Sequence, residues 1–188
     1  MIARARATDL LIAPPGLPDP RFCNTVLMLT HTHHSGSFGL CLNKQTQHTL
    51  DQVVEAIDVE LDYVPRIPIY WGGPVSPNSL WMIHSPDWYI DRSSVEISKD
   101  WLMTSNIEMF QHLADGDHPR HFRIVMGHCS WGPGQLESEL AGVGPWRPEH
   151  SWLIAQNMGP EWVLEQDPEE LWASATTLCS HQAVDSWL

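Results

Sequence analysis

Segment 127–140 constrains the fold of this chain more than any other stretch. It reads Gly-His-Cys-Ser-Trp-Gly-Pro-Gly-Gln-Leu-Glu-Ser-Glu-Leu. The apolar run 122–126 leads into it, three glycines and a proline interrupt it, and a short amphipathic stretch begins at Gln135. This order predicts a strand that ends before Gly127, a tight turn and the first turn of a helix.

The composition is that of a globular protein with one core. The 188 residues are 43% hydrophobic, and no Pro-, Gly- or Ser-rich linker divides them, so we expect a single domain over 1–188. The first apolar run stops at Pro14, and none approaches the ~20 residues of a membrane span. We therefore expect no membrane association.

Cysteine usage and charge indicate the compartment and limit the partners. Cys23, Cys41, Cys129 and Cys179 are far apart and form no CxxC pair, which favours reduced thiols in the cytoplasm. The formal net charge is −13, from 23 acidic and 10 basic residues. Because DNA binding needs clustered basic side chains that displace counterions from phosphates, direct nucleic-acid binding is disfavoured.

Short apolar or alternating runs, each closed by glycine, proline or polar residues, predict eight short strands. The first two long ones are joined by the polar stretch 31–36 and form a hairpin. The predicted strands are 10–13, 26–30, 37–43, 67–71, 80–84, 93–98, 122–126 and a last one at 152–155.

Three helices have start signals. Thr49 with Gln52, and Ser105 with Glu108, have the spacing of capping boxes, the second preceding a buried stripe of Ile107, Phe110 and Leu113. A last helix opens at Asp167-Pro168, and the tail 180–188 is expected to be irregular. The fold class is therefore α+β, a single domain with a mixed, largely antiparallel sheet flanked by three or four helices.

Five motifs occur in the order found in one bacterial family. They are Asp19-Pro20-Arg21-Phe22, the run 38–44 that ends in Asn43-Lys44, Gly72-Gly73-Pro74-Val75, His84-Ser85-Pro86, and the segment from Gly127 to Glu137. Over about residues 10–178 the chain thus resembles the AlgH/YqgE family. The resemblance implies a cytosolic α+β domain on a mixed sheet and no established biochemical activity. The family name associates it with transcriptional control of alginate production.

The chain departs from the family in three places. Gly127-His128-Cys129-Ser130-Trp131-Gly132 stands where the family usually reads Gly-Tyr-Ala-Gly-Trp-Gly, and an extra stretch occupies 144–151. The hairpin loop carries His31, His33 and His34 in place of the family's Glu- and Asn-rich sequence. Any chemistry of these His and Cys residues is therefore particular to this chain.

Several strand ends carry polar or glycine-rich segments, and we expect four of them to converge at one edge of the sheet as a ligand-binding cleft. The alternative is that these residues only lock turns. The candidates are Asn43, Lys44, Gly72, Gly73, Pro74, His84, Ser85, Trp131, Gln135 and Glu137. His84 and Glu137 would form an acid/base pair only within hydrogen-bond reach.

Three further candidate sites each have a structural alternative. Cys129 is better explained as a small buried residue than as a nucleophile, because Trp131 replaces the second glycine of a nucleophile elbow. Glu137 and Glu139, in the first turn of the helix after Gly132-Pro133-Gly134, would repel a phosphate. Three neighbouring histidines at 31, 33 and 34 are more often solvated than metal-bound, so we assign no metal and no cofactor.

The tryptophans divide by context. Trp71, Trp81, Trp101 and Trp152 lie in apolar runs and are expected in the core, whereas Trp88, Trp146 and Trp187 are candidates for a contact surface.

The motifs include no complete catalytic set, and three functions stay open. The favoured one is a regulatory module that binds a small polar ligand or a protein partner. The alternatives are a small-molecule enzyme, for example a hydrolase, with a cleft around Gly73, His84 and Gln135, or a transcriptional regulator that does not contact DNA directly. The sequence does not indicate an oligomeric state.

Overall fold

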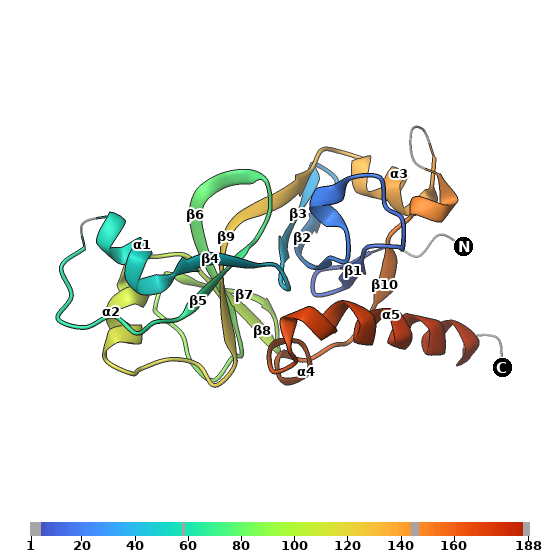
Figure 1. Cartoon of the computed structure of the whole chain (residues 1–188). Helices are drawn as coiled ribbons and strands as arrows, with labels where there is room; N and C mark the ends of the chain where they lie inside the picture. The colour runs from blue at the N-terminus through green and yellow to red at the C-terminus, as the bar shows by residue number, and fades with distance from the viewer. Residues whose placement is uncertain (1–4, 58, 144–146, 186–188) are drawn as a thin grey trace.

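The computed structural model describes residues 5–57, 59–143 and 147–185 (Figure 1). Ten strands of this part of the chain form one mixed, largely antiparallel sheet, with the main order β10-β1-β2-β3-β9-β6-β8-β7. The strands are β1 (Leu10–Ile12), β2 (Val26–His33), β3 (Gly36–Cys41), β4 (Gln45–Thr49), β5 (Pro68–Trp71), β6 (Val75–His84), β7 (Ser94–Ser98), β8 (Trp101–Thr104), β9 (Phe122–Trp131) and β10 (Leu153–Ala155).

Five α-helices lie against this sheet: α1 (Leu50–Ala56), α2 (Glu108–Ala114), α3 (Gln135–Ala141), α4 (Pro160–Leu164) and α5 (Pro168–Asp185). Two single 3₁₀ turns, η1 (Pro20–Phe22) and η2 (Pro148–His150), lie in the connections. In Figure 1, α1 and α2 lie at one end of the molecule, and α3 and α5 lie at the other, on opposite sides of β1 and β2. The predicted α+β class is confirmed.

Strand β9 holds the two ends of the molecule together. Its first half pairs with β5 in parallel, from Ile124 to Met126, and its second half pairs with β3 in antiparallel fashion, from Cys129 to Trp131. Its other edge pairs with β6. Alternate side chains of a strand point to opposite faces, so one strand contributes to more than one core.

The apolar residues of β1 to β3 alternate between two buried faces. Leu10, Ile12 and Met28 pack toward α5, against Leu171 and its neighbours. Leu11, Leu27 and Cys41 pack on the other face, together with Trp131 and with Leu136 of α3. A third cluster joins α1 and α2 to the far end of β9. Both faces of the sheet are therefore covered.

The prediction that the strand ends before Gly127 is wrong. Gly127 has φ +78° but β9 continues on both sides of it, since Val75 pairs with His128 and Gly39 with Cys129. A Cβ at Gly127 would lie 2.3 Å from the carbonyl oxygen of Gly73. Glycine therefore permits a close backbone approach within the strand, and the turn comes five residues later.

Other local expectations also need correction. Strands β4 and β8 and helix α4 were not predicted, and α5 continues to Asp185, so the tail from 180 is helical where it is described. The run that forms β4 is entirely polar and the run that forms β8 is only four residues long, and both strands are held by pairing with a neighbour. Proximity in the fold, rather than local pattern, selects them.

The two predicted capping boxes differ in outcome. At α1 the backbone N–H of Thr49 donates to the side-chain oxygen of Gln52 at 3.1 Å, as expected. At α2 the side chain of Asn106 instead accepts from the N–H of Glu108 at 3.0 Å, and Ser105 Oγ donates to the carbonyl oxygen of Leu80. The buried stripe shifts as a result, and Ile107 is 56% exposed.

The tryptophan predictions hold only in part. Trp101 and Trp152 are buried, and Trp71 and Trp81 are half-buried beside core clusters. Trp88, predicted for a contact surface, is buried, with its indole N–H donating to Asp117 at 3.1 Å. Trp146 and Trp187 lie outside the described residues.

Candidate functional site

The turn after β9 positions the side chains of the candidate site. Gly134 takes φ +72° as the N-cap of α3, and the side-chain oxygen of Gln135 accepts the backbone N–H of Gly132 at 3.1 Å. This contact fixes the orientation of the Gln135 amide. Its NH₂ group then donates to Oε1 of Glu139 at 3.0 Å, one helical turn further on.

Glu139 is a buried carboxylate, 5% exposed, in a helix whose other glutamate, Glu137, is exposed. Its Oε2 accepts two indole N–H groups, from Trp131 at 3.1 Å and from Trp152 at 2.9 Å. Three neutral donors thus compensate for the loss of water around the carboxylate.

A cavity of about 240 Å³ opens beside this carboxylate. Aromatic rings supply much of its wall, since Phe22 packs edge-on against Trp152 at 5.9 Å and tilts toward Trp71 at 5.5 Å. An apolar pocket with a few oriented polar groups is the usual form of a small-molecule site. The lining residues are Leu17, Asp19, Arg21, Phe22, Pro74, Val75, Cys129, Ser130, Trp131, Gln135, Glu139 and Trp152.

The charged groups of the cavity are Asp19, Arg21 and Glu139. Arg21 is exposed and makes a two-pronged contact with Asp19, at 3.0 Å from Nε and 2.6 Å from Nη2. These hydrogen bonds lower the pKa of Asp19, so this carboxylate is ionised at neutral pH. The formal charges of the lining side chains, two carboxylates against one guanidinium, are net negative, which favours hydrogen-bond donors and cations.

Three of the ten predicted site residues meet at this cavity: Pro74, Trp131 and Gln135. Gly72 and Gly73 are not among the lining residues, and a Cβ on either would lie 2.2 Å from the backbone of Gly127 or His128. These two glycines permit the approach of β5 to β9, and they offer no side chain to a ligand.

The predicted convergence of four strand ends is wrong for His84 and Ser85. His84 pairs with Phe122, the first residue of β9, whereas Trp131 is the last residue of that strand. At about 3.3 Å per residue, the two ends are roughly 30 Å apart. His84 and Glu137 are therefore not an acid/base pair.

The contacts of His84 are all made within the protein core and its adjoining turn. The side chain is fully buried, with Nε2 2.9 Å from Thr104 Oγ1 and Nδ1 2.9 Å from the carbonyl oxygen of Ser85. Burial lowers its pKa, although the Ser85 carbonyl and the carboxylate of Asp87 act in the opposite direction. Ser85 Oγ bonds Asp87 and the backbone of His121, which locks the turn.

Asn43 and Lys44 lie away from the cavity and hold a turn. Asn43 Oδ1 accepts from the N–H of Val26 at 2.8 Å, and its amide donates to the carbonyl oxygen of Asn24 at 2.8 Å. Lys44 Nζ donates to the carbonyl oxygen of Cys23. For these two residues the turn-locking alternative describes what the structure shows.

His128 and Cys129 point to opposite faces of β9, as predicted. His128 stacks on Phe38 at 4.3 Å, and Cys129 is buried beside Cys41 on the cavity side. Cys129 lies within the strand and not at a strand-to-helix elbow. The hairpin histidines His31, His33 and His34 are all exposed, and the rings of the last two lie tilted to each other with their centres 3.8 Å apart. Within the described ranges, no three His, Cys, Asp or Glu side chains gather as a metal site.

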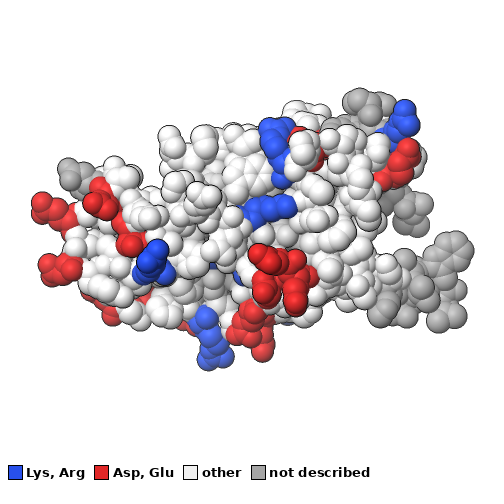
Figure 2. Space-filling view, in the orientation of Figure 1, with Lys and Arg blue, Asp and Glu red and all other residues white. Residues whose placement is uncertain are grey.

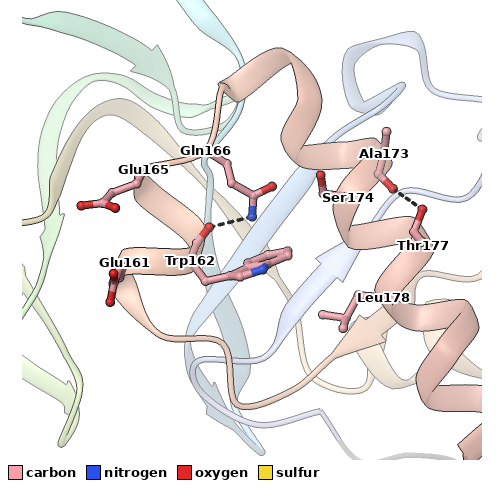
Figure 3. A pocket seen from close by; sticks show the side chains of 8 residues that line it. All are labelled: Glu161, Trp162, Glu165, Gln166, Ala173, Ser174, Thr177 and Leu178. Carbon is pink, nitrogen blue, oxygen red and sulfur yellow. Dashed lines mark hydrogen bonds between the residues drawn. The ribbon is translucent and has the colours of Figure 1, made fainter.

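A second hollow of about 950 Å³ lies between α4 and α5 (Figure 3). Its polar groups bond within their own segments, since Gln166 donates to the carbonyl oxygen of Trp162 and Thr177 to that of Ala173. It is a broad, open groove without a buried charged group. The smaller cavity beside Glu139 is therefore the better candidate site.

The lining residues that the predicted set lacks include Arg21, Phe22, Glu139 and Trp152. The motif Asp19-Pro20-Arg21-Phe22 did mark the first two, but only as part of the family resemblance. Glu139 had no local signal, because its burial depends on two tryptophans from different parts of the chain.

No helix in the part of the chain that the structure describes is long and apolar enough to cross a membrane.

The chain is similar in sequence to members of one bacterial protein family. A model of the AlgH-like family matches residues 10–183. A UPF0301 protein of Burkholderia cenocepacia is 33% identical over 173 residues, 90% of this chain and 86% of its own, and one of Cupriavidus metallidurans gives the same values.

Two solved structures are also similar. The solution structure of the AlgH protein from Pseudomonas aeruginosa has a TM-score of 0.74 at 27% identity, covering 95% of this chain and 92% of its own. A crystal structure from Corynebacterium diphtheriae, 18% identical with a TM-score of 0.71 over 93% and 87% of the chains, shares the fold. The chain belongs to the AlgH-like UPF0301 family.

Proposed function

We propose that this protein is a regulatory module that binds a small ligand in the cavity between η1, the end of β9 and α3. The observation that carries the proposal is the buried Glu139 carboxylate, whose position is set by Gln135, Trp131 and Trp152 at the cavity wall. Such prior ordering lowers the entropy cost of binding. A volume of about 240 Å³ suits a ligand of small-metabolite size.

The ligand carries hydrogen-bond donors and is neutral or cationic. Glu139 and Asp19 provide acceptors, and the one cationic group, Arg21, is already engaged with Asp19. The aromatic rings of Phe22, Trp131 and Trp152 suit an alkyl-ammonium or guanidinium group with an apolar body. An anionic ligand would face net repulsion.

This proposal is favoured over the enzyme and over a DNA-binding regulator. The enzyme alternative relied on His84, which lies at the opposite end of β9 and is bonded to Thr104 and Ser85. On the face in Figure 2 the basic side chains do not form one continuous patch, and acidic side chains gather over the start of α5 and also occur near α1. Any regulatory role would then act through ligand-dependent protein contacts in the cytoplasm, a location consistent with four unbridged cysteines.

The test is an NMR screen of three fragment sets: ammonium or guanidinium compounds, neutral compounds and carboxylates. We expect the first two sets to shift the indole N–H signals of Trp131 and Trp152, and the carboxylates to leave them unchanged. Fragments that shift only the Trp162 signal, or none at all, would show that the cavity is not the site.

Two matched pairs of variants sharpen the screen. Glu139→Gln and Asp19→Asn each remove one carboxylate from the cavity, and both are expected to weaken the binding of cationic fragments about tenfold. Glu137→Gln, on the exposed face of α3, is the control for the first, and Asp115→Asn, far along the chain in an exposed position, is the control for the second. Equal binding by all four variants would refute the assigned ligand class.

A further inference from the structure

Two buried thiols from adjacent strands lie in contact under the cavity. The sulfur atoms of Cys41 in β3 and Cys129 in β9 are 3.6 Å apart. Cys129 pairs with Gly39, two residues before Cys41, so the two side chains lie on the same face of the sheet. The Cys129 thiol also reaches toward the carbonyl oxygen of Gly72, at 3.5 Å.

The two thiols differ in their access to solvent. Cys129, although only 3% exposed, lines the cavity, whereas Cys41 is fully buried and does not. Burial raises the pKa of Cys41, so this thiol stays protonated. A molecule small enough to enter the cavity therefore meets the sulfur of Cys129 first, with Cys41 directly behind it.

We propose that Cys129 and Cys41 form an oxidation site for small hydroperoxides, which closes to a reversible disulfide. In the first step the Cys129 sulfur attacks one peroxide oxygen, an S–O bond forms and the O–O bond breaks. The thiol proton passes to the leaving oxygen, which departs as water or an alcohol. Cys129 is then a sulfenic acid, and the peroxide has taken up two electrons.

In the second step the Cys41 sulfur attacks the Cys129 sulfur. The S–S bond forms, the S–O bond breaks, and the hydroxyl leaves as water with the Cys41 proton. The sulfurs must close by about 1.5 Å to reach the ~2.05 Å of a disulfide bond, which requires side-chain rotation and a small shift of the strands.

The disulfide would join β3 to β9 and remove a thiol from the cavity wall. The inference stands apart from the ligand proposal, because it needs only the cavity as an entrance and the contact between the two sulfurs. Cys23 is exposed and Cys179 is half-buried, so both must be removed before the reaction of the pair is measured.

The experiment treats the Cys23→Ser/Cys179→Ser protein with hydrogen peroxide and follows its intact mass. We expect a loss of about 2 Da, the mass of two hydrogen atoms, at a rate proportional to peroxide concentration, and its reversal by dithiothreitol. Adding Cys41→Ser should stop the reaction at a sulfenic acid on Cys129, which dimedone traps. Peptide mapping of the unmodified chain should show the 41–129 crosslink independently of any variant.

Several results would overturn the proposal. They are gain of oxygen without loss of hydrogen in the protein that keeps both thiols, dimedone labelling of Cys41 in a Cys129→Ser variant, and a rate independent of peroxide concentration. The last would mean that global unfolding, and not the cavity, exposes the thiols.

Discussion

The indole of Trp152 donates a hydrogen bond of 2.9 Å to Oε2 of Glu139, and both side chains are buried. The contact joins the segment before β10 to α3, and it places a carboxylate where no cation is bonded to it among the described residues. The cavity and the local stability of the molecule therefore depend on the same carboxylate.

Glu139→Gln should destabilise the protein by about 1–3 kcal/mol. The N–H of Gly132 fixes the Gln135 amide so that its NH₂ group faces residue 139. A glutamine at 139 has one oxygen in place of two, so its own NH₂ group would face either the NH₂ group of Gln135 or the indole N–H groups, which would then lose their acceptor. Urea unfolding measures the change. Glu137→Gln on the same helix is the control and should stay within about 0.5 kcal/mol of the unmodified protein; an equal effect of the two variants would contradict the assigned role.

Arg123→Lys should cost about 1.5–3 kcal/mol. Arg123 is 5% exposed, and its guanidinium donates to the carbonyl oxygen of Leu42 at 2.6 Å and to that of Leu164 at 3.0 Å, while lying 4.6 Å from the ring centre of Tyr70. An ammonium group cannot span both carbonyls and stack on the ring. Arg120→Lys, at an exposed position, is the control in thermal unfolding. Similar melting temperatures for the two variants would show that the contacts of the Arg123 guanidinium do not stabilise the fold.

Stability should fall as the pH drops below about 6.5. Burial lowers the pKa of His84 in the folded state, and also that of His128, relative to the 6.5 of the unfolded chain. At a pH between the two pKa values, the unfolded chain binds more protons than the folded protein. The stability that the neutral histidines contribute is therefore complete above the pKa of the unfolded chain, and it is lost as the pH falls through their pKa in the folded protein.

His84→Gln is expected to reduce this pH dependence. Urea midpoints between about pH 5 and about pH 7.5 measure it, with His48→Gln, an exposed histidine, as the control. A slope in the His84 variant as steep as in the unmodified protein would assign the dependence to other groups.

Gly127→Ala should destabilise far more than Gly116→Ala. Both glycines have a positive φ, of +78° and +75°, so each alanine pays the ~1–2 kcal/mol of a left-handed conformation. A Cβ at Gly116 meets nothing within 4 Å, whereas one at Gly127 lies 2.3 Å from the Gly73 oxygen and would push the connection between β5 and β6 away from β9. Equal unfolding free energies would show that the strands adjust at no cost.

The sequence by itself determined the features that depend on local chemistry. Helix α1 begins where Thr49 and Gln52 meet, α5 opens at Pro168, and the alternating apolar residues of the first strands supply two buried faces. It also identified the turn before Gln135 as an organising element. Hydrogen-bonding partners a few residues apart are close in any fold, so such features can be predicted from the chain alone.

The tertiary structure alone decided which strand ends share a site. His84 and Trp131 both follow apolar runs, yet the antiparallel register of β6 and β9 sends them to opposite ends. Gly127 looked like a turn and became a contact between strands, because Gly73 approaches it from another segment. Register and close approach depend on partners that are distant in sequence. Such partners also decide which glutamate of α3 is buried, because Trp131 and Trp152 bond Glu139 and leave Glu137 exposed.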